Sequence, residues 1–251
     1  MSKRRKAIIA LLLIIAFSCG GYSIFYFAKR ASVGKVYQDL AKEVEMVQPL
    51  VVNTTDEPVA EPIPIDFEKL WEINPEIYAW IQIPGTEINY PIVQSATDND
   101  YYLNHSIEHQ AGLPGSIFTE NRNSKDFTDY NTIIYGHNMM DRTMFSSLHD
   151  YQDLDYFNGH REIIIYTPER KIVYKVFAAV RYTNVSLLDK FIFTSLEMRQ
   201  SFLASLKDGE NGKGTVLDEE ENLVDRRMIT LSTCDDTQGV GRYLVVAVEQ
   251  E

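Results

Sequence analysis

The chain has 251 residues, of which 45% are hydrophobic and 24% are charged. This composition suits one sizeable folded domain with appendages and excludes an intrinsically disordered protein. Two cysteines are too few for a small disulfide-stapled domain or for a structural zinc site built on cysteines. The formal net charge is −12, and the first 30 residues carry six basic and no acidic side chains, so the remainder carries −18. A domain this acidic repels phosphate backbones, and nucleic acid is therefore not expected as a partner.

An uncharged, mostly apolar run of 22 residues occupies positions 7–28. A helix of that length spans roughly 33 Å, enough to cross the hydrocarbon core of a bilayer. The run follows the basic segment 1–6, so the positive-inside rule predicts a cytoplasmic N-terminal tail, a single membrane anchor and an extracytoplasmic remainder. A cleaved signal peptide is a weaker interpretation, because the run is long and no small-x-small site follows it. A lipoprotein interpretation would use Cys19, but Phe17 fits that motif poorly.

Residues 29–65 are predicted to connect this anchor to the folded domain. Apolar residues at helical spacing within 31–48 predict an amphipathic helix or stalk. Residues 49–65 hold four prolines and no helical pattern, which is typical of an extended linker. The folded domain is expected at 66–251, with Asp66 as the N-cap of a short helix that ends near Trp71.

Short runs rich in β-branched and aromatic residues dominate the expected domain. Residues 79–83 and 87–94 flank a turn at Pro84 and Gly85, which predicts a hairpin. Further strands are expected at 116–120, 131–136, 162–167, 171–183, 227–233 and 243–248. Helices are expected at 141–151, 153–159 and 195–207, the last opened by a capping box that starts at Thr194, and 208–214 is expected to be a flexible loop. This pattern favours a mainly β fold, a closed barrel or a sandwich, over a βαβ fold.

Four of the five histidines are not expected to be catalytic. His105 and His109 stand four residues apart, but they lack the Glu of an HExxH motif and an evident third ligand, so they are interpreted as a solvated pair. His149 and His160 lie among polar residues and are interpreted as surface residues. No metal-binding or phosphate-binding motif is present, and neither a metal nor a cofactor is expected.

Three other residues lie where predicted strands end or begin. His137 follows the strand at 131–136, Cys234 follows the strand at 227–233, and Arg242 precedes the strand at 243–248. A thiol attacks carbonyl carbon as the thiolate, and an imidazole can exchange protons with the reacting groups. A forked guanidinium can hold an oxyanion and a substrate chain. These residue types together favour acyl transfer by a cysteine nucleophile.

Simpler interpretations of the same residues stay open. Cys19 lies in the predicted membrane span and cannot pair with Cys234, which leaves Cys234 either a reactive thiol or a buried inert one. Arg242 is equally suited to an ordinary ion pair with Asp235 or Asp236.

Several motifs together resemble the sortases, which are membrane-anchored cysteine transpeptidases of Gram-positive bacteria. The segment 230–234 (TLSTC), followed by Arg242 at the start of the next strand, is similar to the sortase active-site signature. The segment 133–151 (IIYGHNMMDRTMFSSLHDY) resembles class B sortases in particular. Further similarity to this class lies at 79–94, 98–106, 115–118 and the helix at 195–207. The resemblance extends over about residues 66–251.

The resemblance implies an eight-stranded β-barrel with N-terminal helices and an extra helix in a long loop. It implies that Cys234 is the nucleophile, His137 the general acid and base, and Arg242 the group that binds substrate and oxyanion. It also implies a set of residues near the substrate: Asn104, Ser232, Thr233 and Asp235. The chain departs from the family pattern where some relatives present a substrate-contacting aromatic residue, for which Phe191 and Phe193 are the candidates here.

The activity that the resemblance implies is two successive acyl transfers at the outer face of a cell membrane. Cys234 would cleave a C-terminal sorting motif after Thr in a secreted protein, and an amine of a peptidoglycan precursor would resolve the thioester. A pilin lysine is an alternative acceptor within the same family. A cysteine hydrolase that uses water and a non-catalytic domain that binds cell-wall proteins are the other open alternatives.

Overall fold

The computed structural model describes residues 3–44, 62–112, 114–208, 214–216, 222–235 and 241–250. The chain divides into two compact units, residues 1–40 and 41–251, and each is described by itself.

The first unit consists of the helix α1 (Lys3–Val44), whose last four residues belong to the second unit. The predicted membrane span at 7–28 and most of the predicted stalk at 31–48 lie in this continuous helix. Within the described part of the chain, no helix combines the length and the apolar character needed to cross a bilayer. The predicted anchor is therefore not confirmed. The predicted linker at 49–65 lies outside the described residues except for 62–65.

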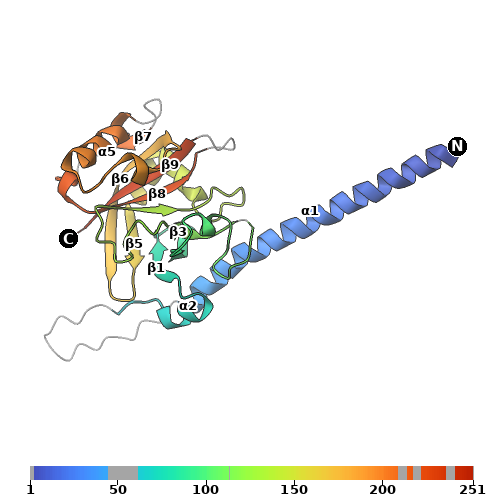
Figure 1. Ribbon diagram of the computed structural model, residues 1–251, viewed down its shortest axis with the longest axis horizontal. Helices are drawn as coiled ribbons and strands as arrows, with labels where there is room; N and C mark the ends of the chain where they lie inside the picture. Colours follow the sequence, from blue (N-terminus) through green and yellow to red (C-terminus); the bar gives the residue numbers. More distant parts are fainter. Residues whose placement is uncertain are drawn as a thin grey trace. The chain divides into compact units, whose positions relative to one another are not determined.

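The second unit is built on a sheet that closes on itself (Figure 1). Its described strands are β1 (Ile77–Gln82), β2 (Asn89–Val93), β3 (Ile117–Thr119), β4 (Asn131–Tyr135), β5 (Glu162–Tyr166), β6 (Lys171–Thr183), β7 (Gly214–Val216), β8 (Met228–Cys234) and β9 (Gly241–Glu249). The strand order is β5-β1-β2-β3-β4-β8-β9-β6-β7, and β6 also pairs with β5. That pairing closes a mixed barrel of eight strands, which confirms the predicted barrel, and leaves β7 outside it.

The strand β6 makes the closure possible because it is 13 residues long. Its residues 171–175 pair with β5, and beyond a bulge between Val176 and Ala178 its residues 178–180 pair with β7. The other edge of β6 pairs with β9 over nearly its whole length. A bulge increases the local twist, which helps one strand serve two neighbours on the same edge.

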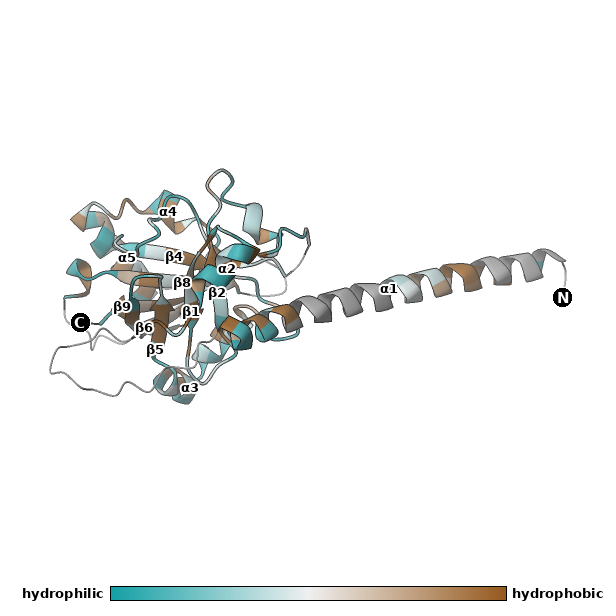
Figure 2. Cartoon of the chain, turned by 90° about the horizontal axis from the view of Figure 1, so that it is seen from below, coloured by the Kyte–Doolittle hydropathy of each residue, from teal (hydrophilic) through white to brown (hydrophobic). Residues whose placement is uncertain are grey.

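The strands around the predicted site are buried on both faces. One face of β6 and β9 lines the barrel, and the other is covered by the segment that carries α4 (Leu187–Lys190) and α5 (Leu196–Asp208). Phe202 and Leu206 of α5 belong to the same buried cluster as Leu244 and Val246 of β9. Figure 2 shows β6 and β9 as hydrophobic, as burial on two faces requires.

Local signals account for most element boundaries. The helix α2 (Phe67–Ile73) is capped by Asp66, whose carboxylate accepts a 3.0 Å bond from Lys69 N, and β1 and β2 form the predicted hairpin. At its turn, Gly85 has φ 78°, a conformation that glycine adopts without steric cost. The helix α3 (Leu154–Gly159) and α5 also lie where they were predicted. Ser195 rather than Thr194 caps α5, since its Oγ accepts from Met198 N.

One expectation about local structure is wrong, and another is described only at its two ends. The predicted helix at 141–151 is a loop followed by the 3-10 helix η2 (Ser146–Gln152), because Arg142 and Met144 have φ of 68° and 56°, outside the helical region. Of the predicted loop at 208–214, Asp208 ends α5 and Gly214 begins β7, and 209–213 lie outside the described residues. Two shorter 3-10 helices, η1 (Tyr101–Leu103) and η4 (Leu223–Asp225), complete the described elements.

Candidate active site

Cys234 and Arg242 are direct partners in the antiparallel β8–β9 ladder. Residues opposite each other in such a ladder point to the same face of the sheet. Arg242 Nη1 lies 3.5 Å from Cys234 Sγ, and both side chains are half-buried. The guanidinium can donate to the sulfur at this distance, and the thiolate is the nucleophilic form of cysteine.

The alternative of an ordinary ion pair between Asp235 and Arg242 is not what the structure shows. Asp235 instead pairs with Arg181, with Oδ1 3.4 Å from Nε. Among the described residues, no carboxylate forms an ion pair with Arg242. Asp236 lies outside those residues. The guanidinium therefore faces the thiol and the adjoining cavity.

His137 follows β4 at the same end of the sheet as Cys234. The strands β4 and β8 are parallel neighbours, and their register ends at Tyr135 opposite Ser232. His137 and Cys234 each lie two residues further along, and neighbouring strands are about 4.8 Å apart. The register therefore brings the imidazole and the thiol to adjacent strand ends.

The imidazole of His137 is oriented by a backbone carbonyl. Its Nε2 lies 2.6 Å from Leu103 O, and because a carbonyl only accepts, Nε2 carries the donated proton. In the described part of the chain no hydrogen bond joins the ring to the Cys234 thiol or involves Nδ1. Nδ1 is therefore the nitrogen left to exchange a proton with a substrate.

Gly136 allows the chain to reach this position. A Cβ on residue 136 would come within 2.5 Å of Ile117 Cδ1 and 2.7 Å of the Phe145 ring. Its backbone N donates to Ser232 O at 3.1 Å, which extends the pairing with β8 by one bond. The sequence Tyr-Gly-His thus has its glycine where any side chain would displace the histidine.

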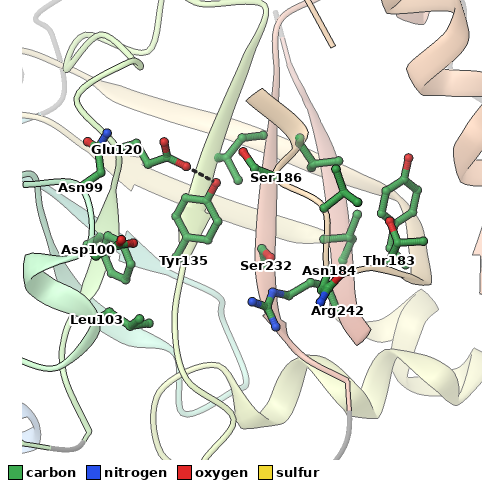
Figure 3. Close-up of a pocket in the computed structure, with 16 residues that line it drawn as sticks. Asn99, Asp100, Leu103, Glu120, Tyr135, Thr183, Asn184, Ser186, Ser232 and Arg242 are labelled. Atoms are coloured by element: carbon green, nitrogen blue, oxygen red, sulfur yellow. Dashed lines mark hydrogen bonds between the residues drawn. The ribbon is translucent and has the colours of Figure 1, made fainter. Parts of the chain in front are cut away.

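A cavity of about 200 Å³ is lined by Arg242, the ladder partner of Cys234 (Figure 3). Its floor is the outer face of the sheet, with Tyr135, Ser232, Arg242 and Leu244. One wall comes from the segment 99–103 and the other from residues 182–187, between β6 and α4. The mixture of polar and apolar lining residues suits a peptide segment.

A buried carboxylate lies across the cavity from Arg242. Tyr135 donates to Glu120 Oε1 at 2.7 Å, and Arg122 Nε donates to Glu120 Oε2 at 2.7 Å. Arg122 Nη2 also donates to Ser186 Oγ at 3.2 Å, so the network connects the wall at 182–187 to the end of β3. Burial and the neighbouring Glu120 carboxylate raise the pKa of Tyr135, so its hydroxyl stays a neutral donor.

Of the four predicted substrate-binding residues, one lines the cavity and three do not. Ser232 lines the cavity. Thr233 does not, because alternation along β8 turns it to the opposite face, where it is 2% exposed and opposite Tyr243. Asp235 is engaged by Arg181 and does not line the cavity. Asn104 is exposed at the end of η1, and its neighbour Leu103 lines the cavity instead.

Of the aromatic candidates, Phe191 is a core residue and Phe193 is half-buried against the same cluster. Their rings pack against Phe202 of α5, with centroids 5.4 and 5.3 Å from it. Neither lines the cavity, so the prediction that one of them meets substrate does not fit their position. Tyr182 lines the cavity from the same side.

The interpretation of His149 as a surface residue is wrong. It is half-buried, and its Nε2 lies 2.9 Å from the backbone oxygen of Cys234. Asn138 Nδ2 reaches the same oxygen at 3.3 Å. Nothing in the sequence marks this contact, because His149 and Cys234 are 85 positions apart.

The pair His105 and His109 is joined by Tyr101. His105 Nδ1 lies 2.8 Å from Tyr101 O, and His109 Nδ1 lies 3.2 Å from the Tyr101 hydroxyl. Among the residues that the structure describes, no group of three or more His, Cys, Asp and Glu side chains could hold a metal ion.

Comparison with known proteins supports the resemblance seen in the motifs. Residues 81–250 match the family model of the sortase domain. Sortase B of Staphylococcus aureus is 32% identical over 257 residues, covering 98% of this chain and 96% of that protein. Sortase B of Listeria monocytogenes is 35% identical over 170 residues, covering 68% of this chain and 67% of that protein.

Comparison with solved structures indicates the same family. A solved Staphylococcus aureus sortase B–substrate complex superposes with a TM-score of 0.66 and 31% identity, covering 91% of this chain and 98% of that one. The match includes the mixed eight-stranded barrel on which Cys234, His137 and Arg242 are placed. The chain therefore belongs to the sortase family, within class B, and is a cysteine transpeptidase.

Proposed function

We propose that the chain cleaves a C-terminal sorting motif after Thr in secreted proteins and transfers them to an amine of a peptidoglycan precursor. The observation that carries this proposal is the Cys234–Arg242 pair, in which Arg242 lines the cavity and its Nη1 lies 3.5 Å from Sγ. His137 at the adjacent strand end supplies the proton-transfer group that such a reaction needs. The relative solved as a sortase B–substrate complex supports substrate binding in this class.

In the first transfer, the Cys234 thiolate attacks the carbonyl carbon of the Thr residue. Arg242 donates to the oxygen that becomes negative, and donors fixed in advance stabilise such an oxyanion without reorganisation. The C–N bond of the peptide then breaks, and His137 gives a proton to the leaving amine. The acyl group stays on Sγ as a thioester.

In the second transfer, an incoming amine attacks the thioester carbonyl. His137, now neutral, accepts the proton that the amine loses, and the C–S bond breaks to return the thiolate. The new amide joins the secreted protein to the acceptor. The same residues therefore act in reverse order in the two halves of the reaction.

We also propose a membrane location, with residues 1–6 in the cytoplasm, 7–28 as a single-pass anchor and 66–251 as the extracellular domain. In α1, the apolar side chains of Leu12, Ile14 and Phe17 are 59%, 63% and 78% exposed. Lipid would cover such a surface favourably. Labelling of intact cells with a membrane-impermeant maleimide should modify Cys234, and labelling only after lysis would contradict this topology.

The experiment that tests the reaction uses the full chain with a panel of sorting-motif peptides and an added amine, followed by mass spectrometry. A thioester on Cys234 followed by a peptide–amine product, both absent in Cys234→Ala, is the expected result. A thioester that only water resolves would indicate a hydrolase, and faster transfer to a pilin lysine would indicate a pilin acceptor. No adduct with any peptide would leave a wall-protein-binding domain.

A further inference from the structure

Two side chains bind the backbone carbonyl of Cys234 itself. His149 Nε2 lies 2.9 Å from this oxygen and Asn138 Nδ2 lies 3.3 Å from it. A carbonyl has no proton to give, so both nitrogens donate, and His149 carries a proton on Nε2. The two nitrogens are 3.1 Å apart, as expected of two donors that converge on one acceptor.

The end of the β4–β8 ladder explains why this carbonyl depends on side chains. Alternate carbonyls of a strand point to the same neighbour, so the oxygens of Ser232 and Cys234 both point toward β4. Ser232 O accepts from Gly136 N at 3.1 Å. After Gly136 the chain turns away into the loop before η2, and Phe145 N binds His137 O at 3.0 Å. Among the described residues no backbone N–H donates to Cys234 O, and His149 and Asn138 take that place.

Packing holds the His149 ring in the orientation that donates to Cys234 O. It lies in η2, and its ring packs on Tyr243, with centroids 4.9 Å apart and an angle of 33° between the rings. Tyr243 is 1% exposed and immediately follows Arg242 in β9. The other donor, Asn138, immediately follows His137. The contacts around one carbonyl therefore connect the backbone segments that carry all three reacting groups.

We propose that His149 is a positioning residue for the transpeptidation. Its Nε2–H fixes the peptide plane that follows Cys234, and this plane sets the direction of the Cα–Cβ bond and the place of Sγ beside Arg242. His149 does not line the cavity and need not touch the substrate. The inference rests on the proposed role of Cys234 as the nucleophile.

The test compares three variants of the full chain with a peptide that the wild-type enzyme turns over. His149→Phe keeps a ring on Tyr243 but has no donor, and His149→Gln keeps an N–H donor at a similar reach. His160→Ala is the matched control, because His160 also binds a backbone carbonyl, that of Tyr156, but on α3, away from the site. The readouts are kcat, KM and the melting temperature of each variant.

We expect His149→Phe to lower kcat about tenfold with KM within about twofold, since a small displacement of a reacting group is costly. We expect His149→Gln to restore kcat to within about threefold of wild type, and His160→Ala to match wild type. If the Phe variant does not fold, the Gln variant decides alone: near wild-type kcat supports the role, and a tenfold loss overturns it.

Two other results would overturn the inference. One is a folded His149→Phe with wild-type kcat. The other is His149→Gln as slow as His149→Phe at the same melting temperature, because the donor would then not be what matters. A wild-type chain that forms no thioester on Cys234 would instead overturn the proposed function, and the inference with it.

Discussion

Arg242 Nη1 lies 3.5 Å from Cys234 Sγ because the two residues are direct partners in the β8–β9 ladder. The backbone bonds of two strands hold the thiol and the guanidinium together. Residues 236–240, which connect them along the chain, lie outside the described residues. The pair is thus set before any substrate binds, and preorganised charge is the most effective form of electrostatic catalysis.

Arg242→Lys should lower kcat/KM about 10²- to 10³-fold, because an ammonium cannot reproduce the forked donor at the oxyanion. The melting temperature should change little, since among the described residues Arg242 has no ion-pair partner to lose. Steady-state transpeptidation of a sorting-motif peptide measures the effect. Arg227→Lys is the control, because Arg227 binds Glu249 away from the cavity. Wild-type rates in Arg242→Lys would show that charge alone is sufficient.

Gly136→Ala should lower kcat at least about tenfold, because the added Cβ would displace the backbone that carries His137. The clash is with Ile117 and the Phe145 ring. Single-turnover acylation of Cys234 measures the effect. Gly159→Ala is the matched control, since a Cβ there meets nothing within 4 Å. Equal rates for the two variants would contradict the proposed constraint on His137.

Phe202→Ala should lower the free energy of unfolding by about 3–5 kcal/mol, the range for deleting a fully buried aromatic ring. Phe202 is 0% exposed and packs edge-on against Phe191 and Phe193. KM for peptide should also rise, because this cluster supports the wall of the cavity at 182–187. Urea denaturation and peptide kinetics measure the two effects. Leu196→Ala, at a 54% exposed position of the same helix, should change both little.

The free energy of unfolding should fall as the pH rises above about 10. Burial raises the pKa of Tyr130 to about 12, against partial opposition from the Arg199 charge, and it raises the pKa of Tyr78, Tyr151 and Tyr174 as well. Unfolded tyrosines ionise near pH 10, so above that pH the unfolded state binds fewer protons than the folded state. This contribution is fully present below pH 10 and is lost as the pH rises through the folded pKa values.

Urea denaturation between about pH 8 and pH 11, with tyrosinate absorbance of the folded chain in parallel, measures this dependence. The folded chain should show delayed ionisation relative to the urea-unfolded chain. Stability that stays constant over this range, together with ionisation near pH 10 in the folded state, would contradict the raised pKa values.

The sequence by itself determined the elements whose signals are local. The alternation in 79–94 around Gly85 predicted the β1–β2 hairpin, and the carboxylate of Asp66 predicted the start of α2. The short apolar runs predicted the eight strands of the barrel, and the local motifs around Cys234 and His137 indicated the family. These signals are read correctly because each depends on neighbours within a few residues, through φ and ψ preferences, capping or side-chain alternation.

Only the tertiary structure decided what depends on residues distant in sequence. The strand β7 forms because β6 offers it an unpaired edge, and its three residues are too short a run to predict a strand. His137 binds a carbonyl 34 positions away and His149 one 85 positions away, so neither orientation could be read from a motif. Hydrogen bonds between such residues form only after the barrel has fixed the register of β4, β8 and β9, and that register places each group within reach of its partner.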